Sequence, residues 1–256
     1  MASCTGDMED GSVAEPEAPS GTDQACAIGL SDASEPPPPL GLMTSLPIYW
    51  PLGADLSDLA SGGEAHTWQR AAIERCFTLV PLDTLSAIPA LSPTDADIDP
   101  LAGLERMAVI QPRGLSPQDN VALDDWVRDG GDLLIALDPA LTGEYDLALG
   151  DPRLPTMSAL IPPVIERWGL GVSFDEGQEL TVIEEDLGYA QIPLALPGFL
   201  ATTSDNCTLA AQGAVAKCAI GKGQVTVIAD AALFEHQELV GENGATLASL
   251  FDYAFN

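Results

Sequence analysis

The feature that most constrains the fold of this chain is a pair of apolar runs separated by one clearly delimited helix. Met107–Ile110 and Leu133–Leu137 contain only apolar residues, which is typical of strands buried on both faces of a sheet. Between them, Ser116 is placed to cap a helix that starts at Pro117, and Gly130-Gly131 ends that helix. The order strand, helix, strand predicts two parallel strands joined by a crossover helix.

The remaining segments extend this order toward both ends of the chain. Residues 86–103 and 140–157 are predicted to be connections, and short apolar runs between residues 172 and 220 predict an antiparallel extension. We therefore expect the α/β class: a flavodoxin-like, mostly parallel sheet with helices on both faces and an antiparallel β extension. The other expected strands are Leu40–Trp50, Phe77–Leu82 and Gln224–Ala229, and the other expected helices are Ala65–Cys76, Ser158–Trp168 and Gly244–Phe255.

Composition divides the chain into two regions. The first 42 residues contain eight acidic residues, no basic residue and four consecutive prolines, Pro36 to Pro39. Such a segment buries too little apolar surface to offset its ordering entropy, so residues 1–42 are predicted to be a disordered acidic linker and residues 43–256 one α/β domain. Over the whole chain, 39 Asp and Glu residues oppose 9 Lys and Arg residues, a formal charge of -30. This charge argues against nucleic-acid binding, and no apolar run is long enough to span a membrane.

The cysteines bear on the compartment in which the protein works. Cys207 and Cys218 flank Gln212-Gly213, so a tight turn at those two residues would place the cysteines opposite each other in an antiparallel pair. Directly opposed residues have about the Cα separation that a disulfide needs, and a disulfide implies an oxidising compartment. The alternative is two free, half-buried thiols. Cys76 is expected to be a buried core thiol.

The start of the chain has two interpretations. Met1–Gly6 resembles the end of a bacterial lipoprotein signal, in which small residues precede a lipidated cysteine, here Cys4. Either the hydrophobic stretch that normally precedes this motif lies upstream of the sequence, or the N-terminus is an ordinary cytosolic one. If Cys4 carries a lipid, the acidic linker would hold the domain away from the membrane surface.

Polar residues follow each predicted parallel strand. In open α/β sheets, ligands bind beyond the carboxyl ends of the strands. We therefore expect a small polar pocket there, with one cation among carboxylates and aromatic side chains, for a small ligand of unknown identity. The alternative is that these residues only cap helices and form turns. The candidate ligand-binding residues are Ser45, Tyr49 and Trp50 after the first strand, Asp83 after the second, Gln111 and Arg113 after the third, Asp138 after the fourth and Asp230 after the last.

Three local patterns do not amount to a catalytic or metal site. Asp138 and Asp230 are too few carboxylates to define a cation site. Glu235-His236-Gln237-Glu238 lacks the second histidine of a zinc motif, and Gly221-Lys222-Gly223 lacks the spacing of a phosphate-binding loop, so it is expected to be a hairpin turn. We therefore assign no catalytic residue, metal ligand or cofactor from the sequence.

Three segments of the sequence resemble a known group. Ala122–Pro139 has a helix, Trp-Val-Arg-Asp-Gly-Gly, an apolar strand and Asp-Pro; Ile220–Leu233 has Ile-Gly-Lys-Gly-Gln, a strand and Asp-Ala-Ala-Leu; and Asn243 opens the last helix. Together they resemble the class I glutamine-amidotransferase-like domain of GldG-type proteins, the group of uncharacterised ABC-type transport systems. The resemblance covers most of residues 40–256 and implies an extracytoplasmic accessory or binding part of an ABC transporter.

The pattern of the catalytic amidotransferases is missing. Those enzymes place a cysteine in a Gly-x-Cys-x-Gly turn after a central strand, whereas Asp138-Pro139-Ala140-Leu141 follows the strand here, and only His66 and His236 are available as a histidine base. The resemblance therefore implies no glutaminase activity. We expect a non-catalytic binding or scaffold domain in the periplasm or cell envelope, associated with a membrane transporter subunit. The alternatives are a hydrolase that uses carboxylates, with or without a metal, at the carboxyl edge of the sheet, and a cytoplasmic protein without a transporter.

Overall fold

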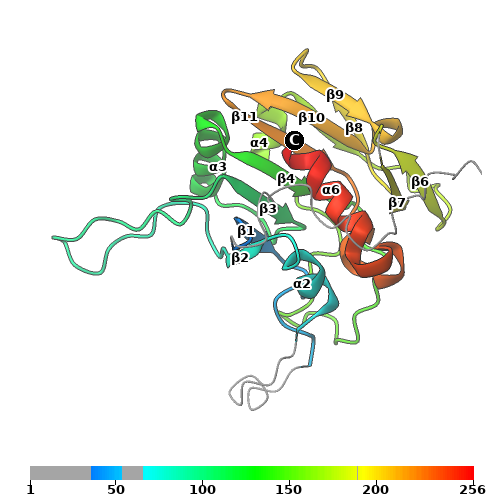
Figure 1. The fold of residues 1–256 in the computed structure, drawn as a ribbon, viewed down its shortest axis with the longest axis horizontal. Coiled ribbons are helices and arrows are strands. Elements are labelled where there is room, and N and C mark those ends of the chain that lie inside the picture. The colour runs from blue at the N-terminus through cyan, green and yellow to red at the C-terminus, as the bar shows by residue number, and fades with distance from the viewer. Residues whose placement is uncertain (1–35, 54–65, 189) are drawn as a thin grey trace, which may run out of the picture.

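The computed structural model describes residues 36–53, 66–188 and 190–256. Its centre is a seven-stranded sheet in which five neighbouring strands run parallel (Figure 1). Five parallel strands in the spatial order second, first, third, fourth, fifth are the flavodoxin-like arrangement, so the predicted fold class is confirmed. In spatial order the strands are β2 (Thr78–Pro81), β1 (Pro39–Thr44), β3 (Arg106–Ile110), β4 (Asp132–Ala136), β11 (Gly223–Ile228), β10 (Val215–Ile220) and β9 (Cys207–Ala210).

Helices cover both faces of this sheet, as the sequence predicts. One face packs against the first and last helices of the described chain, and the other face packs against two helices from its middle (Figure 1). None of the helices in the described ranges is long and apolar enough to cross a membrane. The first face carries α2 (Trp68–Ile73), α5 (Ala232–Glu235) and α6 (Ala245–Phe255); the second carries α3 (Pro117–Asp129) and α4 (Pro163–Arg167); single 3₁₀ turns lie at Ala211–Gly213, Gln237–Leu239 and Glu242–Gly244.

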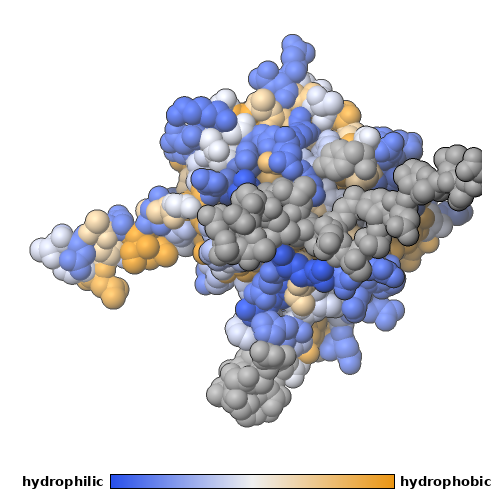
Figure 2. Space-filling view, in the orientation of Figure 1, coloured by the Kyte–Doolittle hydropathy of each residue, from blue (hydrophilic) through white to orange (hydrophobic). Residues whose placement is uncertain are grey.

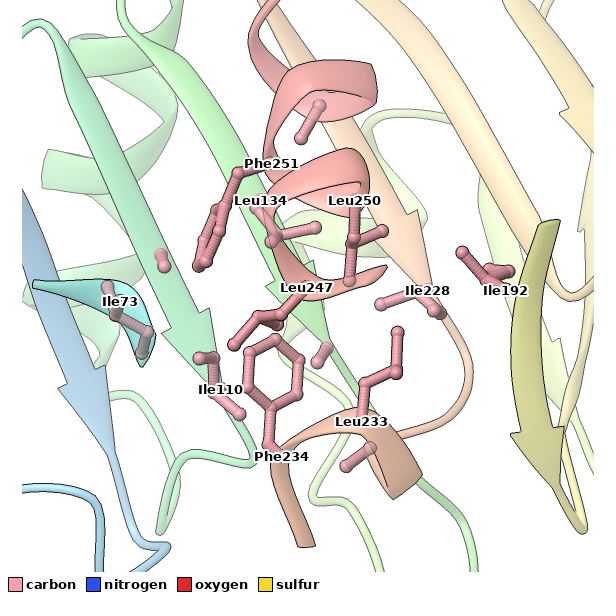
Figure 3. Packing of buried hydrophobic residues seen from close by; sticks show 14 of the residues in the cluster. Ile73, Ile110, Leu134, Ile192, Ile228, Leu233, Phe234, Leu247, Leu250 and Phe251 are labelled. Atoms are coloured by element: carbon pink, nitrogen blue, oxygen red, sulfur yellow. The ribbon is translucent and has the colours of Figure 1, made fainter. Parts of the chain in front are cut away.

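The two faces have separate apolar clusters because side chains alternate along each strand. In β4, Leu134 belongs to the cluster under α2 and α6, whereas the neighbouring Leu133 belongs to the cluster under α3 and α4, and both are fully buried. Figure 3 shows the α6 side, where Phe251 and Leu247 lie above the strands. Phe251 also packs edge-on against Phe77, with ring centroids 5.3 Å apart. Strands β1, β3, β4 and β11 are therefore largely buried, whereas the edge strand β2 contains no buried residue.

Helix α3 begins where the sequence predicts. Ser116 Oγ accepts a hydrogen bond from the Asp119 amide (3.0 Å), and the Asp119 carboxylate accepts one from the Ser116 amide (3.1 Å), which is a capping box. The other carboxylate oxygen of Asp119 accepts from the amides of Leu85 and Ser86, at 2.8 and 2.9 Å. Burial acts in the opposite direction, but these hydrogen bonds hold the pKa of Asp119 below its ordinary value. This one side chain therefore joins the loop after β2 to the start of α3.

The antiparallel extension is present and is larger than predicted. β10 pairs antiparallel with β11 and with β9, and Gly221-Lys222 forms the expected hairpin turn between β10 and β11. Two further strands that the sequence did not predict lie in this region. They are β7 (Gln191–Ala195) and β8 (Phe199–Thr202), and β7 contains Pro193. The additional two-stranded sheets pair β5 (Leu170–Ser173) with β8 and β6 (Val182–Asp186) with β7.

The β9–β10 hairpin has the predicted register and the predicted disulfide. Cys207 is paired with Cys218 across the two strands, and a disulfide joins them. The turn residues Gln212 and Gly213 have positive φ angles of 49° and 96°, as a tight hairpin requires. Cys76 is buried as expected, but the prediction of a free thiol is wrong because Cys76 is disulfide-bonded. Every cysteine within the described ranges is therefore oxidised.

Two element boundaries differ from the sequence-based expectation. The first strand ends at Thr44 instead of Trp50, because the Thr44 hydroxyl accepts a hydrogen bond from the Leu46 amide (3.0 Å) and the chain turns there. Helix α4 begins at Pro163 instead of near Ser158. Prolines occupy positions 162 and 163, and a residue that precedes a proline avoids the helical region, so the helix cannot extend upstream.

The folded domain also begins earlier than expected. The boundary expected after residue 42 falls inside β1, where Leu40 and Leu42 are fully buried. Upstream of β1, the carbonyl oxygens of Pro37 and Pro38 accept hydrogen bonds from the hydroxyl and the amide of Thr78, at 3.0 and 2.9 Å. Pro37 and Pro38 therefore extend the line of β1 beside the start of β2. Residues 1–35, which include Cys4 and most of the expected linker, lie outside the described residues.

The predicted connection at residues 86–103 forms an arm that projects from the body of the domain (Figure 1). An isolated antiparallel bridge between Ile88 and Ile98 holds its two sides together. Both side chains and that of Leu91 are exposed, and Figure 2 shows apolar surface on this arm. The arm therefore adds apolar surface outside the core.

Removing the Cys207–Cys218 disulfide is expected to destabilise the domain. The bond closes a loop with a sequence separation of 11, and the entropy of closing such a loop corresponds to about 2–3 kcal/mol. The double variant Cys207→Ser/Cys218→Ala, compared with the wild type by urea unfolding without reductant, should lose about this free energy of unfolding while the Cys76 bond stays intact. Equal unfolding midpoints with equal slopes would show that the hairpin does not depend on the disulfide.

Candidate functional site

The carboxyl ends of the parallel strands bring together four of the residues that the sequence predicted. Ser45 follows β1, Gln111 follows β3, Asp138 follows β4 and Asp230 follows β11. All four are buried. In this strand order the sheet has its topological switch point between β1 and β3, which is where flavodoxin-like folds bind ligands. The contacts made at this switch point therefore show whether the edge is open to a ligand.

Gln111 connects the ends of β3 and β4. Its side-chain oxygen accepts a hydrogen bond from the Asp138 amide (2.8 Å), and its side-chain nitrogen donates to the carbonyl oxygens of Asp138 (3.0 Å) and Thr156 (2.7 Å). The residue is fully buried and has a φ of 44°, a conformation that costs a non-glycine residue about 1 kcal/mol or more. The surrounding hydrogen bonds hold this strained conformation in place.

The chain's own connection covers the switch point. The amide of Thr156 donates to Ser45 Oγ (3.0 Å), the amide of Ala159 donates to the carbonyl of Asp138 (2.8 Å), and the amide of Leu141 donates to the carbonyl of Met157 (3.0 Å). Residues 140–159 therefore form a loop that is closed at its base and bonded to the ends of β1 and β4. Polar groups that would face a ligand in an open site are paired with this loop.

Asp138 is completely buried, and each of its two carboxylate oxygens accepts a hydrogen bond from a backbone amide. One carboxylate oxygen accepts from the Ala140 amide (2.7 Å) and the other from the Ala231 amide (2.8 Å). Burial raises the pKa of Asp138 to about 7; these two hydrogen bonds oppose that change, and the charge of Glu235 adds to it. Asp138 therefore joins the loop after β4 to the loop after β11.

Asp230 has the same arrangement. Its carboxylate accepts hydrogen bonds from the amide of Ala195 in β7 (2.8 Å) and from the amide of Ala232 (2.7 Å). Burial raises the pKa of Asp230 well above its ordinary value, and the neighbouring charge of Asp138 raises it further. The two carboxylates expected at this edge therefore do interact electrostatically, but each is hydrogen-bonded to backbone.

Glu235 is a member of this cluster that sequence reasoning missed. Its carboxylate accepts from the amides of Thr142 and Gly143, both at 3.0 Å, and from the Tyr145 hydroxyl at 2.5 Å. Burial and this carboxylate together raise the pKa of Tyr145. A Cβ atom at Gly143 would collide with the Glu235 carboxylate, so the glycine is required for this contact. The only sequence signal was the Glu-His-Gln-Glu run that begins at Glu235, which had been considered solely as a zinc motif.

The other predicted site residues do not join the cluster. The Tyr49 hydroxyl donates to the Leu42 carbonyl (3.0 Å), and Trp50 is exposed with the Arg70 guanidinium 6.0 Å from its ring centroid. Asp83 and Arg113 are exposed and form no hydrogen bond or ion pair within the described part of the chain. Across the described ranges, no three His, Cys, Asp or Glu side chains converge in a way that could hold a metal ion. The arrangement found is a buried hydrogen-bonded cluster.

No protein-family model and no curated protein sequence matches this chain. Solved structures align at low identity: exo-β-1,4-mannosidase Op5Man5 from Opitutaceae bacterium strain TAV5 is 11% identical over 86% of this chain and 36% of that chain, with a TM-score of 0.46. Cytoplasmic protein STM3548 from Salmonella typhimurium is 10% identical over 86% and 100% of the two chains (TM-score 0.45), and a ThuA-like protein from Parabacteroides merdae is 9% identical over 85% and 90% (TM-score 0.40). The chain thus spans 36% of the length of the mannosidase. Similarity at this level indicates no ligand or activity.

The buried carboxylates predict an unusual dependence of stability on pH. Because the pKa of Asp138 is raised to about 7 in the folded chain, the folded state binds more protons than the unfolded state between about pH 4 and pH 7. The free energy of unfolding should therefore fall as the pH rises through this window, by up to about 4 kcal/mol from this group. Urea unfolding at a series of pH values measures the slope.

The variant Asp138→Asn cannot ionise, so its unfolding free energy should fall less steeply over the same window. The matched control is Asp125→Asn, which removes one exposed carboxylate from α3 and should keep the wild-type slope. Identical slopes for wild type and Asp138→Asn would mean that Asp138 is not protonated in the folded chain.

Proposed function

We propose that this chain is a non-catalytic binding or scaffold domain, which acts at the cell envelope as an accessory of an ABC-type transporter. The non-catalytic part of this proposal rests on one observation. Backbone amides of the chain already donate hydrogen bonds to the carboxylates at the carboxyl edge of the sheet. Asp138, Asp230 and Glu235 each accept hydrogen bonds from two backbone amides. A general acid or base must reach a proton of the substrate or of water, and these carboxylates are already bound to backbone.

One hydroxyl–imidazole pair lies next to the cluster and lacks the rest of a nucleophilic site. Thr142 Oγ1 is 2.8 Å from His236 Nε2, but the carboxylate of Glu238 is 3.6 Å from His236 Nδ1 and is exposed. The amides of Thr142 and Gly143, which would have to stabilise an oxyanion, donate to the carboxylate of Glu235. A negative charge therefore already lies where a tetrahedral intermediate would need positive potential.

The alternative function, a hydrolase that uses carboxylates at this edge, has one observation in its favour. A pKa of about 7 at Asp138 suits general acid–base chemistry near neutral pH. To act, however, Asp138 would have to release the amides of Ala140 and Ala231, which would detach the loops after β4 and β11 from each other. The non-catalytic function needs no such rearrangement.

Different observations support the envelope and the transporter. Disulfides persist in oxidising compartments, and the three cysteines in the described ranges, Cys76, Cys207 and Cys218, are all bonded. The link to a transporter is supported by the resemblance of Ala122–Pro139 and Ile220–Leu233 to GldG-type proteins. Together they favour an extracytoplasmic accessory over a cytoplasmic protein.

The location is tested by the intact mass of the protein purified from its native host, measured with and without reductant and after thiol labelling. We expect Cys207 and Cys218 to resist labelling until reductant is added, and a diacylglyceryl-sized addition on the peptide that contains Cys4. Purification from detergent-solubilised membranes should then recover a transporter subunit with the chain. An unlipidated chain with all five thiols labelled would contradict the envelope location.

The absence of catalysis is tested with an activated ester. We expect purified protein to hydrolyse p-nitrophenyl acetate no faster than the variants Thr142→Val and Asp138→Asn, because neither side chain is free to attack or to transfer a proton. Both variants are checked for folding by circular dichroism. A wild-type rate that is lost in either folded variant would support the hydrolase instead.

A further inference from the structure

A cavity of about 440 Å³ lies between α2 and the segment 237–244 that leads into α6. Figure 1 shows both elements at the same end of the sheet, beyond the arrowheads of β3 and β4. Ligand pockets in α/β proteins are found at this end, and their volumes are typically about 300–1,000 Å³. The cavity is separate from the Asp138 cluster, none of whose carboxylates lines it.

One face of α2 and the turn after it forms a wall of the cavity. Trp68, Ala71, Ala72 and Arg75 all line it, and their spacing places them on one side of a helix. Because the side chains of the two alanines are small, they leave space in the middle of this wall. A Cβ atom at Gly244 would lie 2.9 Å from that of Ala72, so the opposite wall also needs a small residue. The result is a hollow with an indole at one end and a guanidinium at the other.

The polar side chains around this cavity have no partners. Within the described ranges, the indole N–H of Trp68, the guanidinium of Arg75 and the carboxamides of Gln237 and Asn243 make no hydrogen bond or ion pair with the protein. The Asp138 cluster is the opposite case, because its polar groups are bound internally. Unpaired donors that converge on a cavity are available to a ligand.

The charge of the cavity also differs from that of the chain. Among the described residues, Arg75 is the single charged residue that lines it, whereas the whole chain has a formal charge of -30. Of the nine Lys and Arg residues, all of which lie in the described ranges, Arg75 and Arg113 alone make neither an ion pair nor a hydrogen bond there. Arg75 differs from Arg113 in that it lines a cavity, where its guanidinium can bind a carboxylate with two parallel hydrogen bonds.

We propose that this cavity binds a small organic carboxylate with a flat apolar end. The carboxylate pairs with Arg75, the flat group lies against the indole of Trp68, and the carboxamides of Gln237 and Asn243 bind polar substituents. Residues seven apart on a helix are separated by roughly 10 Å along its axis, which sets the length of the ligand. The inference rests on the proposed binding role and names its ligand class.

The probes are benzoate, 4-phenylbutyrate and phenyl phosphate, with the neutral 4-phenylbutyramide for comparison. Calorimetric titration of the full chain at physiological ionic strength should show saturable binding of benzoate or 4-phenylbutyrate, and weaker binding of phenyl phosphate and of the amide. Arg75→Gln should weaken that binding by about tenfold to a hundredfold, the usual effect of losing a charged hydrogen bond. Arg113→Gln, which removes the other unpaired arginine, should bind like the wild type.

A second variant keeps the test independent of charge. Ala71→Leu fills the middle of the cavity while keeping a good helix former at an exposed position of α2, so it should abolish binding without lowering the unfolding midpoint. No saturable binding of either carboxylate up to about 10 mM would overturn the proposal, as would equal losses in Arg75→Gln and Arg113→Gln. Either failure would leave the envelope location and the transporter association untouched, because those are tested by mass and by co-purification.

Discussion

The structure depends on the need to satisfy carboxylates buried at the ends of its two central strands. Asp138 and Asp230 are 0% and 1% exposed, and an unpaired charge at such a depth would be costly. Each carboxylate is instead bonded to two backbone amides, and one of the two amides bonded to Asp230 belongs to β7 of the extension. These bonds attach the loop after β4, the loop after β11 and the small β6–β7 sheet to one another. The raised pKa values show that burial disfavours the charged form of both carboxylates more than these hydrogen bonds stabilise it.

The same interactions determine what the carboxyl edge can do. A flavodoxin-like sheet offers a crevice at its switch point, but here the 140–159 loop is bonded to Ser45 and Gln111 across that crevice. The polar groups of this edge are therefore bonded within the chain, although their residue types are those of a polar binding site. Polar side chains without a hydrogen-bond partner in the described ranges lie instead at the cavity between α2 and the segment 237–244, which precedes α6. A sheet edge that is bonded by the chain's own groups and a cavity beside α2 are consistent with the proposed binding role.

The bonded cysteines of the described ranges lie at two separate places in the fold, in the antiparallel extension and between α2 and β2. The disulfide closes the outermost hairpin of the main sheet, and an edge strand such as β9 is where a sheet most needs such protection. The high acidity of the chain adds self-repulsion that favours solubility and opposes compactness. Covalent bonds at Cys207 and at Cys76 offset part of this repulsion. Both properties agree with the proposed location outside a reducing compartment.

The sequence by itself determined the features that depend on neighbouring residues. The alternation of apolar runs and capped helices gave the parallel sheet, Ser116 and Pro117 gave the start of α3, and Gln212-Gly213 gave the register that pairs Cys207 with Cys218. It also placed Asp138, Asp230 and Gln111 at one edge. Only the tertiary structure decided that these side chains are bound internally, because their partners are distant: Glu235 is 93 residues from Thr142, and Asp138 is 93 residues from Ala231. The cavity beside α2 was beyond sequence reasoning for the same reason, since its two walls come from opposite ends of the folded domain and meet only when α2 and α6 pack on one face of the sheet.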